Sequence, residues 1–213
     1  MPRHVFDKLA LIHHQGRKLR SMTRWKQFGA MVLAQLANRL SLRDIELGLE
    51  AAQGSLYHLG MTRVARSSLA RVNEQQPYQL YQALFQSLYA RYKTVAPRHG
   101  FRFKNKLISL DSSIIALSLN LCRWANYNGH KAAVKLHVGL DHDGMIPALV
   151  DLTRAERHDI VVARSVEFER GTIVVFDLGY TDYAWYKSLT DKGVFFVTRQ
   201  RVNAVYRVVE RCK

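Results

Sequence analysis

Two carboxylates that follow apolar runs are the feature that most constrains the fold of this 213-residue chain. Asp111 ends a run that begins at Leu107, and Asp177 ends a run that begins at Gly171. A carboxylate at the tip of a buried strand is costly unless another group offsets its charge, and a pair of carboxylates suits a divalent metal ion. The pattern predicts two strands that each deliver an acid to a metal site.

The net charge of +15, from 32 basic and 17 acidic residues, suits a polyanionic partner. An anionic membrane surface is the weaker choice, because no apolar run approaches the roughly 20 residues that span a bilayer. No signal-peptide pattern opens the chain, so we expect a cytoplasmic, nucleoid-associated protein. Cys122 and Cys212 are isolated, which argues against a disulfide framework and against a structural zinc site.

The composition changes near Pro97, and we therefore expect two domains. Residues 1–97 have apolar side chains at helical spacing and form a predicted helical domain for DNA binding. Helices are expected at 25–36, after Ser41, at 66–76 and at 78–92. Ser41 and Asp44 approximate a capping box, and the serines after Arg66 are expected to cap the third helix.

The third predicted helix carries Arg66, Arg71 and Asn73 on its polar side. Arginine and asparagine suit guanine and adenine edges, and a short helix, a turn and a second helix are typical of helix-turn-helix readers. The intervening loop is longer than the usual three or four residues. Direct DNA contact and an ordinary basic helical bundle therefore both remain open.

The order of elements in residues 98–203 is more informative than any single motif. Strands are expected at 107–111, 133–141 and 145–152, with a turn at His142–Asp143–Gly144 between the second and third. These strands are followed by two expected helix–strand pairs: a helix at 158–166 with a strand at 172–177, and a helix at 182–190 with a strand at 194–198. This βββαβαβ order is that of ribonuclease H, and by analogy the first and fourth strands lie side by side, so that Asp111 and Asp177 meet.

Four segments carry a resemblance to a known family. They are Leu110-Asp-Ser-Ser113, Lys135-Leu-His-Val-Gly-Leu-Asp141, Asp177-Leu-Gly-Tyr-Thr-Asp-Tyr183 and Gly193-Val-Phe-Phe-Val-Thr-Arg199. In this order the segments resemble the DDE transposases of bacterial insertion sequences, in the group named for insertion sequence four. The N-terminal segments Ser41–Ile45, Leu56–Gly60 and Ser68–Glu74 are similar to the helical domain of one branch of that group.

The resemblance implies a site and its partners. Asp111 and Asp177 would be catalytic acids that bind Mg²⁺ or Mn²⁺ for in-line displacement at phosphorus, without ATP. The partners would be double-stranded DNA, as element ends and target, and a second copy of the chain in a synaptic complex. Apart from the resemblance, the charge of Lys135 makes it a candidate to line a DNA channel, and a solvated surface lysine is the alternative that remains open.

The family's third acid, a glutamate, has no clear counterpart. Glu210 has the wrong spacing from Tyr206 and Arg207, so residues 204–213 are expected to begin a truncated β-rich insertion. We therefore expect an incomplete ribonuclease H-like core and negligible strand transfer. Two alternatives remain: a DNA-binding remnant that competes with an intact transposase, and a nuclease of ribonuclease H type.

Overall fold

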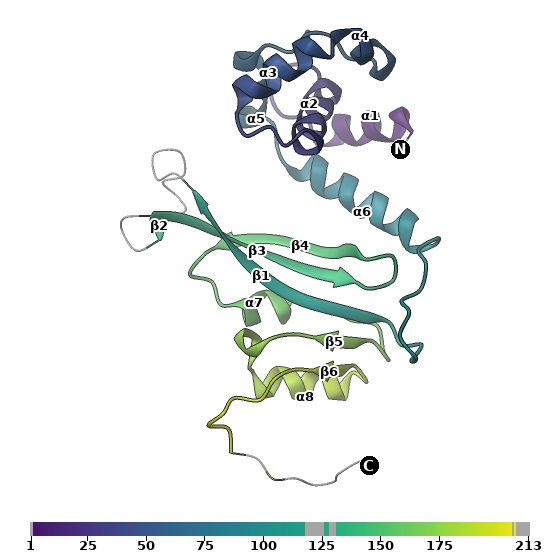
Figure 1. The fold of residues 1–213 in the computed structure, drawn as a ribbon, viewed down its shortest axis with the longest axis vertical. Coiled ribbons are helices and arrows are strands. Elements are labelled where there is room, and N and C mark those ends of the chain that lie inside the picture. Colours follow the sequence, from purple (N-terminus) through teal and green to yellow (C-terminus); the bar gives the residue numbers. More distant parts are fainter. Residues whose placement is uncertain (1, 118–125, 128–130, 206, 208–213) are drawn as a thin grey trace. The chain divides into compact units, whose positions relative to one another are not determined.

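The structure is a computed structural model that describes residues 2–117, 126–127, 131–205 and 207. The chain forms two compact units, Met1–Ala90 and Arg91–Lys213. The boundary between them lies within α6 (Gln79–Lys93), which is the helix predicted at 78–92 (Figure 1). Among the described residues, no helix is long and apolar enough to cross a membrane.

The first unit is helical, as predicted. Its elements are α1 (Arg3–Ile12), α2 (Arg24–Leu36), α3 (Leu42–Ala51), α4 (Gln53–Leu56), the 3-10 helix η1 (Tyr57–Leu59) and α5 (Arg66–Gln75). The core contains Ala30 of α2, Ile45 and Leu49 of α3, and Leu69 and Val72 of α5. The apolar stripes of three helices therefore meet, as expected for amphipathic helices. The stretch expected as a loop after α3 is instead partly helical, in α4 and η1.

The start of α3 is confirmed and the predicted cap of α5 is wrong. The Ser41 hydroxyl accepts the backbone N–H of Asp44 at 3.1 Å. The N-cap of α5 is Ala65, which makes no side-chain cap. Glu46 of α3 takes this role, because its Oε1 accepts the backbone N–H of Arg66 at 3.0 Å. A tertiary acceptor thus replaces the local serine cap.

The second unit contains a mixed sheet, and its order is consistent with the predicted ribonuclease H-like fold. The strands are β1 (Leu107–Leu117), β2 (Asn126–Tyr127), β3 (Lys131–Asp141), β4 (Ile146–Arg154), β5 (Ile173–Val175) and β6 (Phe195–Val197). β3 pairs antiparallel with β1, β2 and β4, whereas β5 pairs parallel with β1 and β6. Among the strands of the described residues, only the short β2 lacks a counterpart in the predicted order.

β1 is longer than predicted, which changes the position of Asp111. The expected strand ended at Asp111, whereas β1 continues to Leu117 because β3 pairs with it as far as Leu117↔Ala132. β5 pairs with β1 only from Leu107 to Ser109. Asp111 therefore lies inside the β1–β3 ladder but beyond the end of the β1–β5 ladder.

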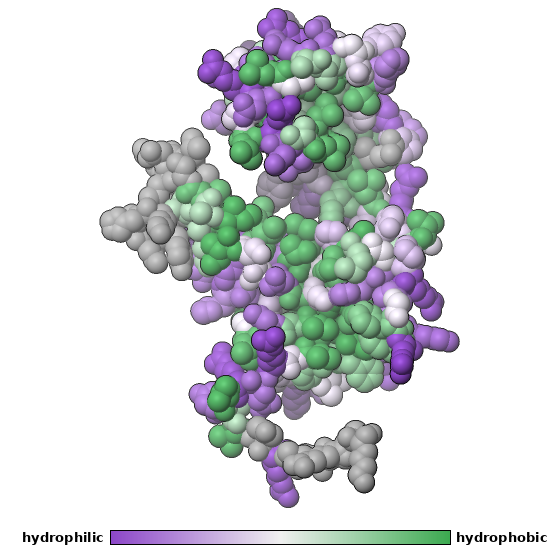
Figure 2. All heavy atoms as spheres, viewed as in Figure 1, coloured by the Kyte–Doolittle hydropathy of each residue, from purple (hydrophilic) through white to green (hydrophobic). Residues whose placement is uncertain are grey.

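Helices cover one face of this sheet. α7 (Asp159–Ala163), η3 (Leu178–Tyr180) and α8 (Tyr183–Asp191) pack against β1 and β5 around Leu110, Val174, Phe176 and Trp185. α7 is shorter than the predicted helix 158–166. Phe195 and Val197 of β6 are more than half exposed. Figure 2 shows hydrophobic side chains gathered in the region of the second unit where Figure 1 shows β5, β6 and α8.

Candidate metal and nucleic-acid site

Strand register brings Asp111 and Asp177 to the same level of the sheet. Ser109 of β1 pairs with Val175 of β5, which in turn pairs with Val197 of β6. Asp111, Asp177 and Arg199 each follow these paired residues by two positions. Because side chains alternate between the faces of a strand, residues two apart project on the same side. Beyond the paired residues Ser109, Val175 and Val197, the next side chains on this side of the three neighbouring strands are therefore those of Asp111, Asp177 and Arg199. We call these three residues a row.

These three side chains line one hollow. It has a volume of about 560 Å³ and is lined by residues 109–111 within β1, by the ends of β5 and β6, and by the residues that follow β5 and β6. Asp111, Asp177 and Arg199 are all exposed. Two carboxylates beside an arginine form a site that suits a divalent cation and a phosphate together, because Mg²⁺ commonly binds to one or two carboxylates plus substrate phosphates. The donor set of the two acids therefore fits such an ion.

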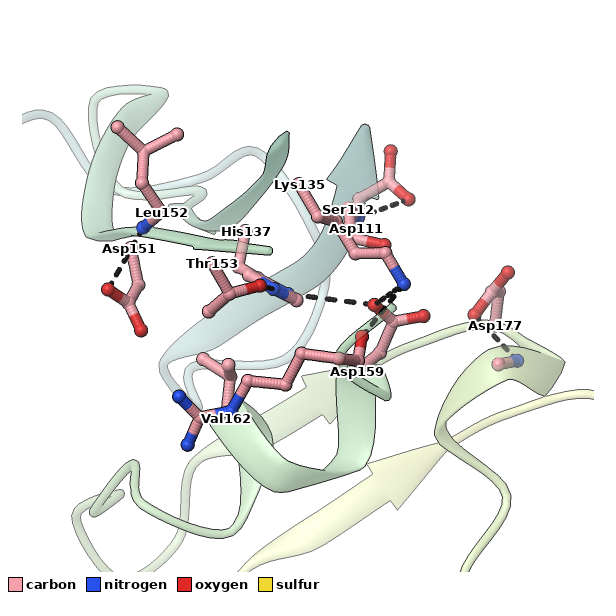
Figure 3. Close-up of polar contacts among 12 residues, drawn as sticks. Asp111, Ser112, Lys135, His137, Asp151, Leu152, Thr153, Asp159, Val162 and Asp177 are labelled. Atoms are coloured by element: carbon pink, nitrogen blue, oxygen red, sulfur yellow. Dashed lines mark hydrogen bonds and ion pairs between the residues drawn. The ribbon is translucent and has the colours of Figure 1, made fainter. Parts of the chain in front are cut away.

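Local hydrogen bonds orient both acids. Asp111 Oδ1 accepts the backbone N–H of Ser112 at 2.8 Å, and Asp177 Oδ1 accepts the backbone N–H of Gly179 at 2.9 Å. Each carboxylate keeps its other oxygen outside these bonds (Figure 3). Within the described residues, no group of three or more His, Cys, Asp or Glu side chains is arranged to hold a metal ion. Glu210 lies outside the described residues.

A third carboxylate, Asp159 of α7, lies close to Asp177. A Cβ built on Gly179 would lie 3.0 Å from Asp177 Oδ1 and 3.1 Å from Asp159 Oδ2, so both carboxylates border the space that the missing side chain of Gly179 leaves open. Burial and the negative charges of Asp159, Asp111 and Asp177 raise the pKa of Tyr180, partly offset by a hydrogen bond with Ser112. Negative charge therefore accumulates around this end of the sheet.

Lys135, which the sequence assigns to DNA contact, is engaged by protein groups. Its Nζ lies 3.1 Å from Asp159 Oδ1 and donates to the backbone carbonyl of Arg157 at 3.0 Å. Its side chain is 13% exposed. Figure 3 shows the ammonium group directed at Asp159. In this arrangement Lys135 neutralises a third acid of the site.

His137 is buried behind the same ion pair. Its Nε2 lies 2.9 Å from Thr153 Oγ1, and its Nδ1 lies 3.7 Å from Asp159 Oδ1. Burial lowers the pKa of His137, although the neighbouring Asp159 raises it in part. The fold therefore disfavours the protonated form of His137, and at 3.7 Å its Nδ1 makes no hydrogen bond to Asp159.

The predicted DNA-binding residues of the first unit lie on α5. Arg66 and Arg71 are exposed. Asn73 is exposed too, but its Oδ1 accepts the Gln27 Nε2–H at 2.6 Å. The two arginines are thus available to an anionic partner, whereas the amide of Asn73 also ties α5 to α2.

Sequence reasoning missed Arg199 and Asp159 as parts of this site. Arg199 is detectable only from the three-strand register, since it is two residues past β6, just as Asp177 is two residues past β5. Asp159 is near the start of a helix, where aspartate is common for capping reasons. No local pattern distinguishes it from a helix-terminal acid.

Comparison with protein families now identifies the chain. Residues 102–211, more than half of the sequence, match the family model described as Transposase DDE domain. The chain belongs to this DDE transposase family, which confirms the predicted family. Residues 1–62 match a second model, described as Domain of unknown function (DUF4372).

Two similar proteins carry transposase names. One is the putative transposase y4zB of Sinorhizobium fredii, 33% identical over 143 residues, which are 67% of this chain and 39% of that protein. Another is a probable transposase for insertion sequence element IS5377 of Geobacillus stearothermophilus, 27% identical over 150 residues, which are 70% of this chain and 39% of that protein. The chain thus spans about two fifths of the length of these relatives.

Two solved structures also resemble the chain. The piggyBac transposase synaptic complex with hairpin DNA aligns with a TM-score of 0.46 and 9% identity, over 93% of this chain and 47% of that one. The Mos1 transposase paired-end complex with the left transposon end aligns with a TM-score of 0.31 and 14% identity, over 85% of this chain and 61% of that one.

Proposed function

We propose that this chain is the DNA-binding and acid-pair portion of an insertion-sequence transposase. The observation that carries the proposal is the shared row of Asp111, Asp177 and Arg199 around one hollow. Asp111 and Asp177 hold Mg²⁺ or Mn²⁺ through their carboxylates. Arg199 binds the DNA phosphate that enters the hollow, because a guanidinium matches phosphate oxygens in a bidentate way.

A bound divalent ion would polarise the phosphoryl oxygens and lower the pKa of an attacking water. The residues of the chain supply the geometry. Asp111 is held by the β1–β3 ladder and Asp177 by its bond to Gly179, so neither carboxylate must be ordered when the ion arrives. The Lys135–Asp159 ion pair limits the negative charge next to Asp177. The substrates are the ends of the element and a target duplex, and a synaptic complex would pair two copies of the chain.

Among the described residues two acids line the hollow, and the nearby Asp159 is paired with Lys135, so we infer negligible strand transfer by this polypeptide alone. The second candidate function is a DNA-binding protein that competes with an intact transposase for element ends. The net charge of +15 favours this second function, since binding to the phosphate backbone of DNA needs cationic side chains and no catalysed reaction. The two functions share DNA binding and differ in metal-dependent chemistry.

One experiment separates the two functions. The chain is titrated with Mn²⁺ by electron paramagnetic resonance and then incubated with supercoiled plasmid and Mn²⁺ or Mg²⁺. Mn²⁺ binding that disappears in Asp111→Ala, with little cleavage, supports the acid-pair proposal. Cleavage that disappears in the same variant would contradict the inferred inactivity. Plasmid binding without any Mn²⁺ binding would favour the DNA-binding competitor.

A further inference from the structure

The segment between α1 and α2 is a fixed loop with basic side chains. Met22 is buried, and Leu19 packs against the core of the first unit. His14 Nε2 donates to the Arg17 carbonyl at 3.1 Å, and Lys26 Nζ donates to the Ser21 carbonyl at 2.7 Å. These anchors hold both halves of the loop against the helices, so its exposed side chains project from an ordered backbone.

A pair of glutamines attaches the loop to the end of α5. The backbone N–H of Gln15 donates to Gln76 Oε1 at 3.3 Å, and Gln76 Nε2 donates to the Gln15 carbonyl at 2.7 Å. Gln76 is buried at 9% exposure, and both bonds are partly buried. The amide side chain thereby fixes the separation between the loop and α5.

The loop and α5 form the two walls of a basic groove. It has a volume of about 1350 Å³ and is lined by Arg17, Lys18 and Arg20 from the loop and by Arg71 from α5. Glu74 is its one acidic lining residue. Arg17, Lys18, Arg20 and Arg71 are all exposed, and none forms an ion pair with another described residue. Four cations thus face one carboxylate.

We propose that this basic groove binds the phosphate backbone of double-stranded DNA. The inference rests on the proposed function and adds a site whose loop wall, but not its α5 wall, lies in the region that matches a domain of unknown function. Small-molecule pockets are mostly apolar and smaller, at roughly 300–1,000 Å³. A large, open, charged groove with unpaired cations suits a linear polyanion, because backbone contacts release condensed counterions.

The groove also explains how α5 would be positioned on DNA. Arg71 belongs both to the groove and to the helix that the sequence predicts as the DNA reader. Phosphate contacts fix register and orientation without reading sequence. Phosphates held between the loop and Arg71 would therefore set the depth at which the N-terminal half of α5, including Arg66, meets the duplex.

The test compares two variants of the full chain with equal charge loss. Arg17→Gln/Arg20→Gln removes two groove cations. Lys8→Gln/Arg43→Gln removes two exposed cations from α1 and α3, which do not line the groove. Binding to a random 30-base-pair duplex is measured by fluorescence anisotropy at several salt concentrations. The groove variant should lose at least about tenfold in affinity at 0.1 M salt, and its log–log salt slope should fall by about 1.8.

The control variant should retain most of the affinity and slope. Equal losses in the two variants, with the unaltered chain still binding, would overturn the groove and leave the acid-pair function untouched. No binding by the unaltered chain would overturn both the groove and DNA binding, whereas Mn²⁺ titration would still report on the acid pair. A loss confined to an RNA duplex of the same sequence would assign the groove to RNA and overturn the proposal.

Discussion

Asp111 in β1 and Asp177 just past β5 lie at equivalent positions, each two residues beyond the paired residues Ser109 and Val175 of these parallel strands. They are 66 residues apart in sequence, yet they line the same hollow. The parallel β1–β5 pairing is what unites them, since it aligns Ser109 with Val175, two residues before each acid, although β1 itself continues to Leu117.

Removal of either acid should weaken metal binding. Asp111→Asn and Asp177→Asn each replace an anionic oxygen ligand by a neutral amide of nearly the same shape. We expect Mn²⁺ affinity to fall by at least about tenfold in each variant, as measured by electron paramagnetic resonance. Asp151→Asn, at an exposed acid of β4, is the matched control and should bind Mn²⁺ as the unaltered chain does. Equal affinity in all four proteins would remove the acid pair from consideration.

Arg199→Gln should change metal and DNA binding in opposite directions. The guanidinium repels a cation in the same hollow and attracts a phosphate, so its removal should tighten Mn²⁺ binding and weaken binding of a short duplex. The salt slope for DNA should fall by about 0.9. Both titrations are made on the same preparation. A parallel loss of both affinities would point to a damaged fold instead of a charge effect.

Gly179→Ala should disturb the acid pair without unfolding the protein. The new methyl group would lie 3.0 Å from Asp177 Oδ1 and 3.1 Å from Asp159 Oδ2, and the carboxylates would have to move by a few tenths of an ångström. We expect Mn²⁺ affinity to fall by about tenfold, as for changes that reorient a ligand. Gly54→Ala, where a Cβ meets no atom within 4 Å, is the control. Unchanged affinity in Gly179→Ala would show that Asp177 does not need its present orientation.

The Lys135–Asp159 ion pair should be worth more to stability than an exposed pair. Lys135→Met leaves a largely buried carboxylate without its cation and should lower the free energy of unfolding by about 2–4 kcal/mol. The double variant Lys135→Met/Asp159→Leu should regain much of that loss, because no charge is then stranded. Lys93→Met, which breaks the exposed pair with Glu169, should cost less than about 1 kcal/mol in urea titrations. Equal costs for the two lysines would refute the role of burial.

His137 should make the protein less stable in mild acid. Burial lowers its pKa in the folded state below the ordinary value of 6.5, so the unfolded chain binds a proton that the folded chain resists. The contribution is absent well above pH 6.5, where both states are neutral, and it destabilises the fold as pH falls below 6.5. Urea unfolding at pH 7.5 and 5.5 should therefore show a smaller acid loss in His137→Gln. A loss equal to that of the unaltered chain would contradict this expectation.

Much of the fold was predictable because local patterns and tertiary packing agree. The apolar stripes of α2 and α3 and the turn before β4 have the spacing that their final structure requires. The length of β1 was not predictable, since Asp111 reads as a strand end and only the partner β3 extends the strand to Leu117. The prediction of a serine cap for α5 was wrong for a similar reason. Glu46, twenty residues away, accepts the backbone N–H of Arg66, which a local serine was expected to accept.

The candidate site was predictable in part. Asp111 and Asp177 stand out as acids after apolar runs, and the order of elements suffices to bring them together. Arg199 and Asp159 needed the three-dimensional structure: Arg199 ends a segment that resembles the family, but only the register of β5 and β6 places it in the site, and Asp159 reads as an ordinary helix-terminal acid. Lys135 shows that charge alone does not predict a residue's partner. Its basic character suggests DNA contact, whereas the structure places its ammonium group beside Asp159.

The two hydrogen bonds between Gln15 and Gln76 impose an order of events during synthesis. They join residues 61 positions apart, so the loop that carries Arg17 and Arg20 leaves the ribosome well before its anchor. A nascent chain that ends at residue 62, the limit of the first matched domain, contains the basic loop without Arg71 or Gln76. The groove can close only after α5 is complete, and a growing chain therefore acquires this surface late.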